Sequence, residues 1–159
     1  MLRLLCLLTL VVACTPQTGV VHSSHAGLEG AYTRQIVISD HAHHVLMGHL
    51  IDGTQAGERQ RMLVIGARRD GVHRLVMREV WSNGVELPFV PTNRRFDGCT
   101  HGHCRDRAVG LIVLSDALFA HAAQHGLSAV LIGSAHSVEI NVPPALFSEL
   151  PEYRVSLPE

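Results

Sequence analysis

The chain of 159 residues contains no lysine, and it has no excess of positive charge. Its 13 basic residues are all arginines and are set against 14 acidic ones, which gives a formal net charge of −1. A near-neutral chain offers no large positive field to nucleic acid or to anionic lipid. We therefore expect no nucleic-acid partner.

Long apolar runs are also scarce. After the first thirteen residues, no stretch approaches the roughly 20 apolar residues that a helix needs to cross a bilayer. Hydrophobic residues make up 47% of the chain and charged residues only 17%. This composition disfavours disorder and predicts a folded domain with a modest surface charge, partly covered by a partner.

The motifs of several large enzyme classes are missing from the sequence. It contains no phosphate-cradling glycine loop, no nucleophile elbow and no dinucleotide fingerprint. His121 and His125 stand four residues apart, but no Glu follows His121, so the zincin pattern is absent. The sequence therefore favours a protein that is not an enzyme.

The first fourteen residues carry the strongest signal in the chain. Arg3 precedes a short apolar run that ends at Ala13 and is followed by Cys14. A positive charge, an apolar stretch and a small residue before a cleavage site are the parts of an export signal. About ten apolar residues span roughly 15 Å as a helix, half of the hydrocarbon core, which disfavours an uncleaved anchor. A secretory signal that is cut elsewhere is the alternative.

Val11-Val12-Ala13-Cys14 resembles the lipobox of bacterial lipoproteins. The resemblance implies cleavage before Cys14, attachment of lipid to its thiol and acylation of the new amino terminus. It implies a protein of the cell envelope, facing the periplasm and held to the membrane by lipid. In lipoproteins of the enteric type, an Asp directly after the lipidated cysteine signals retention in the inner membrane. This chain has Thr15 at that position, which favours the outer membrane.

The rest of the chain has the length of one domain. We expect residues 1–13 to be a signal peptide. Residues 14–30 have neither helical nor strand periodicity, which predicts a lipidated cysteine followed by a flexible tether. Residues 31–159 are expected to form a single globular domain.

Short strand-like runs separated by turn residues fill this domain. Strands are predicted at residues 33–39, 43–51, 61–68, 72–81, 85–89, 108–114, 127–132 and 136–142. The dipeptides Asp70-Gly71 and Asn83-Gly84 predict tight turns, which would make residues 59–90 a three-stranded antiparallel meander.

Two helices complete the predicted elements. Ser115-Asp116 can cap a helix at about 116–125, with Gly126 as its terminator, and Pro143-Pro144 opens a short C-terminal helical turn. The predicted fold class is α+β with a mostly antiparallel sheet. The alternative is a β-sandwich.

Of the four cysteines, Cys6 would be lost with the signal and Cys14 would carry the lipid, which leaves Cys99 and Cys104. Cys99 and Cys104 are five positions apart, and in an oxidising compartment such a pair most simply forms one disulfide. With His101 and His103 they also supply four ligand types that Zn²⁺ accepts, but one tight loop can hardly close a tetrahedron around an ion. A redox-active pair is a further alternative, although Cys-x-x-Cys is absent.

Histidines form a second cluster at His41, His43 and His44. On a strand, His41 and His43 share one face and His44 points away. If this segment lies beside the cysteine loop, His41, His43, His101 and His103 would form a surface site for Zn²⁺ or Cu²⁺. Otherwise these histidines are solvated and no cofactor is expected.

A pair of histidines also stands on the predicted helix. The four-residue spacing of His121 and His125 permits shared metal coordination. Imidazoles in a last turn equally suit the negative end of the helix dipole, which needs no metal.

The sequence thus predicts a membrane-tethered envelope lipoprotein that binds another envelope protein or supports an assembly. The alternative is a periplasmic protein that binds Zn²⁺ or Cu²⁺ through its histidines. A pH-sensing role is a further possibility, because many of the 12 histidines would gain charge around pH 6.

Overall fold

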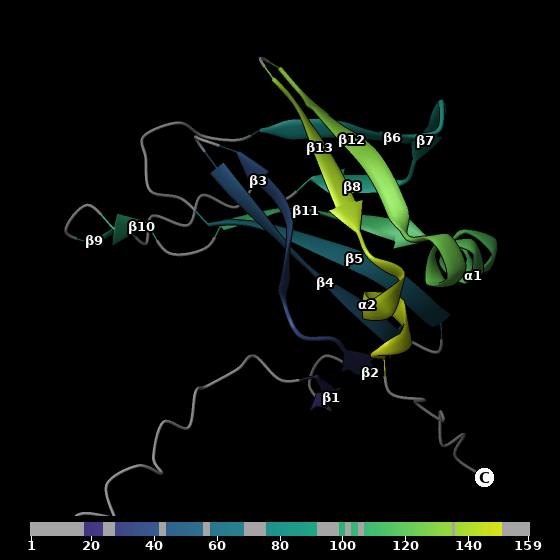
Figure 1. Cartoon of the computed structure of the whole chain (residues 1–159). Coiled ribbons are helices and arrows are strands. Elements are labelled where there is room, and N and C mark those ends of the chain that lie inside the picture. Colours follow the sequence, from purple (N-terminus) through teal and green to yellow (C-terminus); the bar gives the residue numbers. More distant parts are fainter. Residues whose placement is uncertain are drawn as a thin grey trace, which may run out of the picture.

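The computed structural model describes most of the chain. The described residues are 18–23, 28–41, 44–55, 58–68, 76–91, 99–100, 103–104, 107–134 and 136–150. Two antiparallel sheets, sheet A and sheet B, enclose the core, and two helices lie at one end of it (Figure 1). This confirms the predicted α+β class with a mostly antiparallel sheet, a helix at 116–125 and a short C-terminal helix.

Sheet A is built around the long hairpin of β4 and β5. Its seven strands are β1 (Gly19–Ser23), β2 (Leu28–Tyr32), β3 (Ile36–His41), β4 (His44–Gln55), β5 (Glu58–Arg68), β8 (Phe89–Pro91) and β11 (Arg107–Leu114). They lie in the order β1-β2-β4-β5-β11-β8, and all neighbours are antiparallel. The strands β2 and β3 share one edge of β4, pairing with residues 51–55 and 44–48 respectively.

Thr33 bridges the gap between β2 and β3. The Thr33 amide donates to the Leu50 carbonyl (3.0 Å), and the Leu50 amide donates to Thr33 Oγ1 (2.9 Å). The Thr33 hydroxyl donates in turn to the Arg34 carbonyl (3.1 Å). Since Thr33 is buried, these bonds satisfy peptide groups that water cannot reach, and β4 keeps a paired edge across the break.

Sheet B consists of two hairpins placed side by side. Its strands are β6 (Met77–Ser82), β7 (Val85–Leu87), β12 (Leu127–Gly133) and β13 (Ser137–Val142), in the order β13-β12-β6-β7. Asn83 and Gly84 connect β6 to β7 with φ angles of 50° and 78°. Positive φ at both central residues is what a type I′ hairpin turn requires, so the predicted Asn-Gly turn is confirmed.

A separate two-stranded ribbon holds the cysteine pair. It consists of β9 (Cys99–Thr100) and β10 (His103–Cys104).

The predicted meander over residues 59–90 is wrong. The strand β5 pairs with β4 and β11 in sheet A, whereas β6 pairs with β12 and β7 in sheet B. A turn signal such as Asp70-Gly71, which lies outside the described residues, predicts a chain reversal but not the sheet that the next strand joins.

The tether predicted for residues 14–30 is wrong where β1 and β2 form. Gly30 of β2 lies so close to β4 that a Cβ there would come within 2.6 Å of both the Asp52 carbonyl oxygen and the Gly53 Cα. This close approach requires glycine, a residue that weakens the strand signal in the sequence.

The core lies between the inner faces of the two sheets and is closed by the helices α1 (Asp116–His125) and α2 (Pro144–Ser148). Ser115 caps α1, because its Oγ accepts the Leu118 amide (3.2 Å). Gly126 ends α1 at a φ of 80° and donates its amide to the Ala122 carbonyl (2.8 Å). Neither helix is long and apolar enough to cross a bilayer, in the part of the chain that is described.

Candidate functional site

The face of sheet A that is turned away from the core has an apolar centre, with polar and charged residues toward both ends of β5. Residues directly opposite one another in antiparallel strands lie on the same face, so the register identifies its members. We call the following eleven residues the outer face of sheet A: Tyr32, Val37, Val45, Met47, His49, Ile51, Met62, Val64, Val90, Leu111 and Val113. By the same register Asp40 and Arg68, both opposite Val45, lie on this side of the sheet at one end of the outer face, and Gln60 lies at the other end. His49 alone among the eleven can gain a charge near neutral pH.

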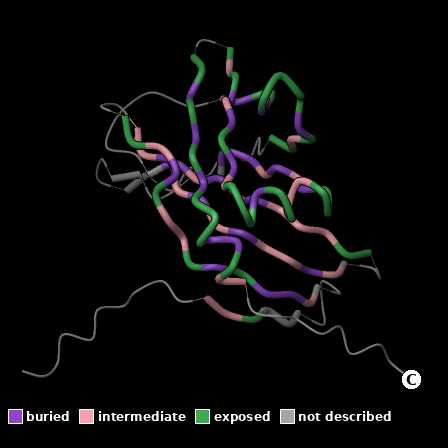
Figure 2. The backbone as a smooth tube through the Cα atoms, turned by 45° about the vertical axis from the view of Figure 1, so that its right-hand side comes forward, coloured by how far each residue is buried: buried purple, intermediate pink, exposed green. Residues whose placement is uncertain are grey.

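The outer face is open to solvent at its margins. Val37 in β3 is 52% exposed and Val90 in β8 is 51% exposed, although both are large and apolar. The side chains between these margins are half-buried, so that buried and intermediate residues alternate along β4 and β5 (Figure 2). The described part of the chain packs both helices and sheet B against the opposite, inner face.

The corresponding face of sheet B is different. Along β13 every second residue is exposed, and these residues are Ser137, Glu139 and Asn141 (Figure 2). The Ser128 hydroxyl of β12 donates to Asn141 Oδ1 (2.8 Å) beside them. Glu79 of β6 lies on the same face, which thus has the polar residues expected of a sheet face that meets water, although Val130, Ile132 and Trp81 also lie on it. Sheet A presents the more continuous apolar layer, and it lacks a covering layer among the described elements.

His49 lies at the centre of the outer face, directly opposite Val64. Burial lowers the pKa of His49 below its usual value, because an imidazolium would lose water at this position. The ring is therefore neutral at pH 7, whereas Asp40 and Arg68, on either side of Val45 in the register, bring charged residues to one end of the same side of the sheet.

A network of charges lies at the end of the inner face. Arg59 Nη2 donates to Asp52 Oδ2 (2.6 Å), and Arg61 Nε donates to the same oxygen (3.2 Å). Arg61 Nη1 also donates to Asp116 Oδ1 of α1 (2.9 Å), and the guanidinium lies 4.5 Å from the centroid of the Phe119 ring. Arg61, a residue of β5, thereby links α1 to sheet A through a hydrogen bond and a ring contact.

The pKa of Asp52 follows from this network. Burial would raise the pKa of the Asp52 carboxyl, but the hydrogen bonds and charges of Arg59 and Arg61 outweigh burial and lower it. An ionised carboxylate held by two arginines is a structural ion pair, without a proton to exchange near neutral pH.

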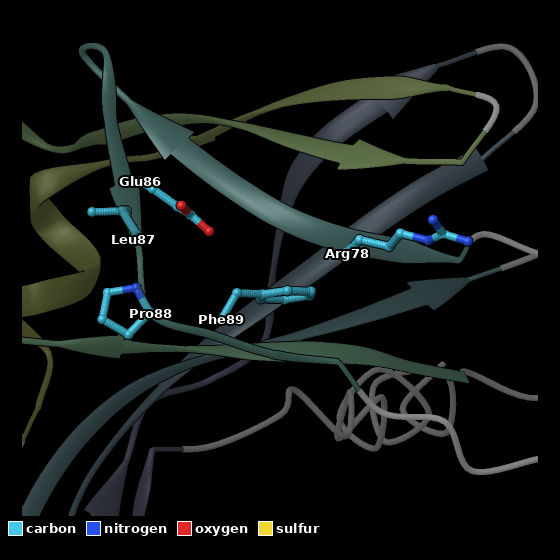
Figure 3. A pocket seen from close by; sticks show the side chains of 5 residues that line it. All are labelled: Arg78, Glu86, Leu87, Pro88 and Phe89. Carbon is cyan, nitrogen blue, oxygen red and sulfur yellow. The ribbon is translucent and has the colours of Figure 1, made fainter.

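A shallow hollow lies between sheet B and β8 (Figure 3). It has a volume of about 290 Å³ and is lined by Arg78, Glu86, Leu87, Pro88 and Phe89. The Arg78 guanidinium and the Glu86 carboxylate lie apart from each other on either side of Phe89 (Figure 3). Without convergent polar groups, the hollow does not have the form of a catalytic pocket.

The structure bears on one member of the predicted four-histidine site. His41 lies opposite His44 in the register of β3 and β4, and their ring centroids are 5.3 Å apart. The expectation that His44 points away from His41 is thus wrong, because the two histidines belong to paired strands, β3 and β4, and not to one continuous strand. His43, His101 and the side chain of His103 lie outside the described residues.

No group of three or more His, Cys, Asp or Glu side chains within the described ranges could hold a metal ion.

The predicted cysteine sites are described only in part. The register of β9 and β10 places Cys99 opposite Cys104 in the backbone. Their side chains, and the whole of Cys14, lie outside the described residues, so the disulfide and the lipid attachment stay predictions.

The outer face of sheet A is not among the sites that the sequence predicts, although a signal for it exists. Residues 45–51, 62–65 and 111–114 are nearly continuous apolar runs, without the alternation seen in residues 137–142. Continuous runs are typical of strands that are covered on both faces.

Comparison with known proteins gives no further assignment: no family model, no curated protein and no solved structure matches the chain.

Proposed function

We propose that this chain is a lipid-anchored protein of the bacterial cell envelope that binds a protein partner through the outer face of sheet A. The observation that supports the binding role is the continuous apolar centre of the outer side of sheet A, which has no covering layer among the described elements, against the mixed polar and apolar outer side of sheet B. The placement in the envelope rests on the export signal and on the lipobox-like segment ending at Cys14.

The partner contributes a flat apolar layer. Sheets bury an apolar face against a second layer of helices or strands, at a spacing of about 10 Å. Sheet B and the helices already cover the inner face, so a helix or sheet of the partner would form a third layer. Among the described strands of sheet A, the register places one arginine on this side, Arg68 at the end of β5, whereas surfaces that lie on membranes are rich in basic residues, which favours a protein over a bilayer as the occupant.

The anchor keeps this binding surface near the membrane. Lipid at Cys14 is separated from the start of β1 at Gly19 by 19 − 14 = 5 residue steps. Five extended residues span at most about 18 Å. A partner must therefore lie in or close to the same membrane, for which Thr15 favours the outer membrane, on its periplasmic side.

Site-specific photocrosslinking tests the binding role. A photoreactive residue at Val37, on the outer face of sheet A, should give one discrete adduct with another envelope protein. The matched control is Val85 at the start of β7, which is an equally small apolar residue with 62% exposure against the 52% of Val37. The same adduct from both positions, an adduct with a second copy of this chain, or lipid adducts alone would overturn the proposed partner.

Mass spectrometry of the mature amino terminus tests the anchor separately. A diacylglyceryl thioether on Cys14 with an acylated α-amino group is expected, and Cys14→Ser should release the protein from the membrane fraction. An intact terminus at Met1 would overturn the lipoprotein assignment while leaving the crosslinking result to decide the role of the outer face.

A further inference from the structure

We propose that α1 carries a two-histidine site for a divalent transition-metal ion, Cu²⁺ in preference to Zn²⁺, formed by His121 and His125. The site is distinct from the outer face of sheet A and does not depend on the proposed function. Its basis is the position of two exposed imidazoles on a rigid helix and the distance between their rings.

The helix presents both imidazoles to solvent. Ala122 is buried on the inner side of α1, and Phe119 packs edge-on against Phe147 of α2, with ring centroids 5.3 Å apart. These contacts fix the rotation of α1 about its axis. His121 and His125 consequently lie on the outward side, both exposed, one turn apart.

The separation of the rings suits one shared ion. The ring centroids of His121 and His125 are 4.7 Å apart. An ion bound at about 2.0–2.1 Å from an imidazole nitrogen lies about 3.2 Å from that ring's centroid. Two rings on one ion then have centroids about 4.5 Å apart at a right angle and about 5.2 Å apart at a tetrahedral angle. The observed distance falls between these two values.

The end of α1 also favours a cation. His125 is the last residue of the helix, where the negative end of the helix dipole lies. A divalent ion would therefore gain from the dipole as well as from the two nitrogens. Water would complete its coordination, because the described residues supply no third ligand there.

The chemistry of the ligands selects the ion. Two neutral imidazoles bind Cu²⁺ and Zn²⁺ but not Ca²⁺ or Mg²⁺, which require oxygen ligands. Copper binds more tightly than zinc at a given nitrogen site.

The other pair of histidines is less suited to an ion from solution. The rings of His41 and His44 are 5.3 Å apart, but Nε2 of His44 is buried. Both rings of the α1 pair are exposed, so an ion can reach them without a change in the fold.

Titration of the full-length mature protein in detergent with Cu²⁺ tests the site. Electron paramagnetic resonance should show two nitrogen ligands on the tightest-bound ion. His121→Ala and His125→Ala should each weaken that binding at least tenfold and leave one nitrogen. His136→Ala, which removes an exposed histidine with no second histidine four residues away, and His41→Ala should leave the affinity unchanged, and circular dichroism should confirm that each variant folds.

Unchanged copper binding in both α1 variants, or an equal loss in His41→Ala or His136→Ala, would overturn the site.

Discussion

At the scale of single residues, Thr33 shows how one hydroxyl replaces a missing stretch of strand. The hydroxyl accepts the Leu50 amide in a place where water has no access. Substitution by an apolar residue of the same shape leaves that amide without its acceptor while the packing is conserved.

Thr33→Val should therefore lower the free energy of unfolding by about 1–3 kcal/mol, the loss expected when a buried donor is left unsatisfied. Urea denaturation measures this as a lower midpoint with an unchanged slope. Thr33→Ser keeps the hydroxyl and is the matched control, which should be clearly more stable than Thr33→Val. Equal stability of the two variants would contradict the assigned role.

His49 should make stability depend on pH. Its pKa is lowered in the folded protein, so below the ordinary value of 6.5 the unfolded chain takes up a proton that the folded protein does not. The free energy of unfolding should fall as the pH drops from 6.5 toward the folded pKa, and this loss should stop below that value.

His49→Gln should flatten this part of the pH profile, measured by urea denaturation between pH 7.5 and about 4.5. The effect of Asp52 is separate, because its lowered pKa places its loss of stability below the ordinary carboxyl value of 3.8. An unchanged profile in His49→Gln would show that other groups cause the dependence.

At the scale of elements, the attachment of α1 depends on a side chain from sheet A. Arg61 bonds both Asp52 and Asp116 and covers the Phe119 ring, with 18% of its side chain exposed. Arg61→Ala should lower the free energy of unfolding by about 1–3 kcal/mol. It should also speed amide hydrogen exchange in α1.

The matched control is Arg59→Ala. Arg59 bonds the same carboxylate but is 52% exposed, and an exposed ion pair contributes about 0–1 kcal/mol. A loss in Arg59→Ala as large as in Arg61→Ala would mean that the link to α1 has no special effect.

Elements set by local chemistry could be predicted from the sequence. Ser115 and Gly126 define the ends of α1 through contacts within a few residues, and Asn83-Gly84 defines the turn of β6 and β7 through backbone preference alone. Elements that depend on distant partners could not. Gly19 lies beneath the Tyr32 ring, where a Cβ would come within 2.7 Å of its hydroxyl oxygen, and nothing near Gly19 in the sequence indicates that neighbour.

The candidate site shows the same division. The apolar runs in β4, β5 and β11 are visible in the sequence, but which of their residues face outward follows only from the register and from the bulges in β3 and β11. A bulge adds one residue to a strand and reverses the alternation beyond it. Alternation read from the sequence alone therefore assigns some side chains to the wrong face.

At the scale of the whole molecule, the proposed lipid on Cys14, five residues before β1, predicts which end of the domain meets the membrane. β1 lies at the lower end of the view in Figure 1 and β7 at the upper end. Val20 in β1 and Val85 in β7 are similarly exposed, at 59% and 62%.

A photoreactive residue at Val20 should therefore form adducts with phospholipid in intact cells, and the same residue at Val85 should not. Cys14→Ser should abolish the Val20 adducts, because it removes the anchor. Equal labelling from both positions would show that the domain is not held by a link of at most about 18 Å.

The strand order determines which core residues are exposed while the chain is still being synthesised. Leu50, Leu63 and Ile65 belong to its first half, while Ile140 and Leu146, which belong to the same hydrophobic core, come near its end. During synthesis the amino-terminal half is made first, and its apolar core residues stay exposed to solvent until the carboxy-terminal residues of the core are added. A chain cut short after Leu114 should for this reason aggregate rather than persist as a smaller soluble domain.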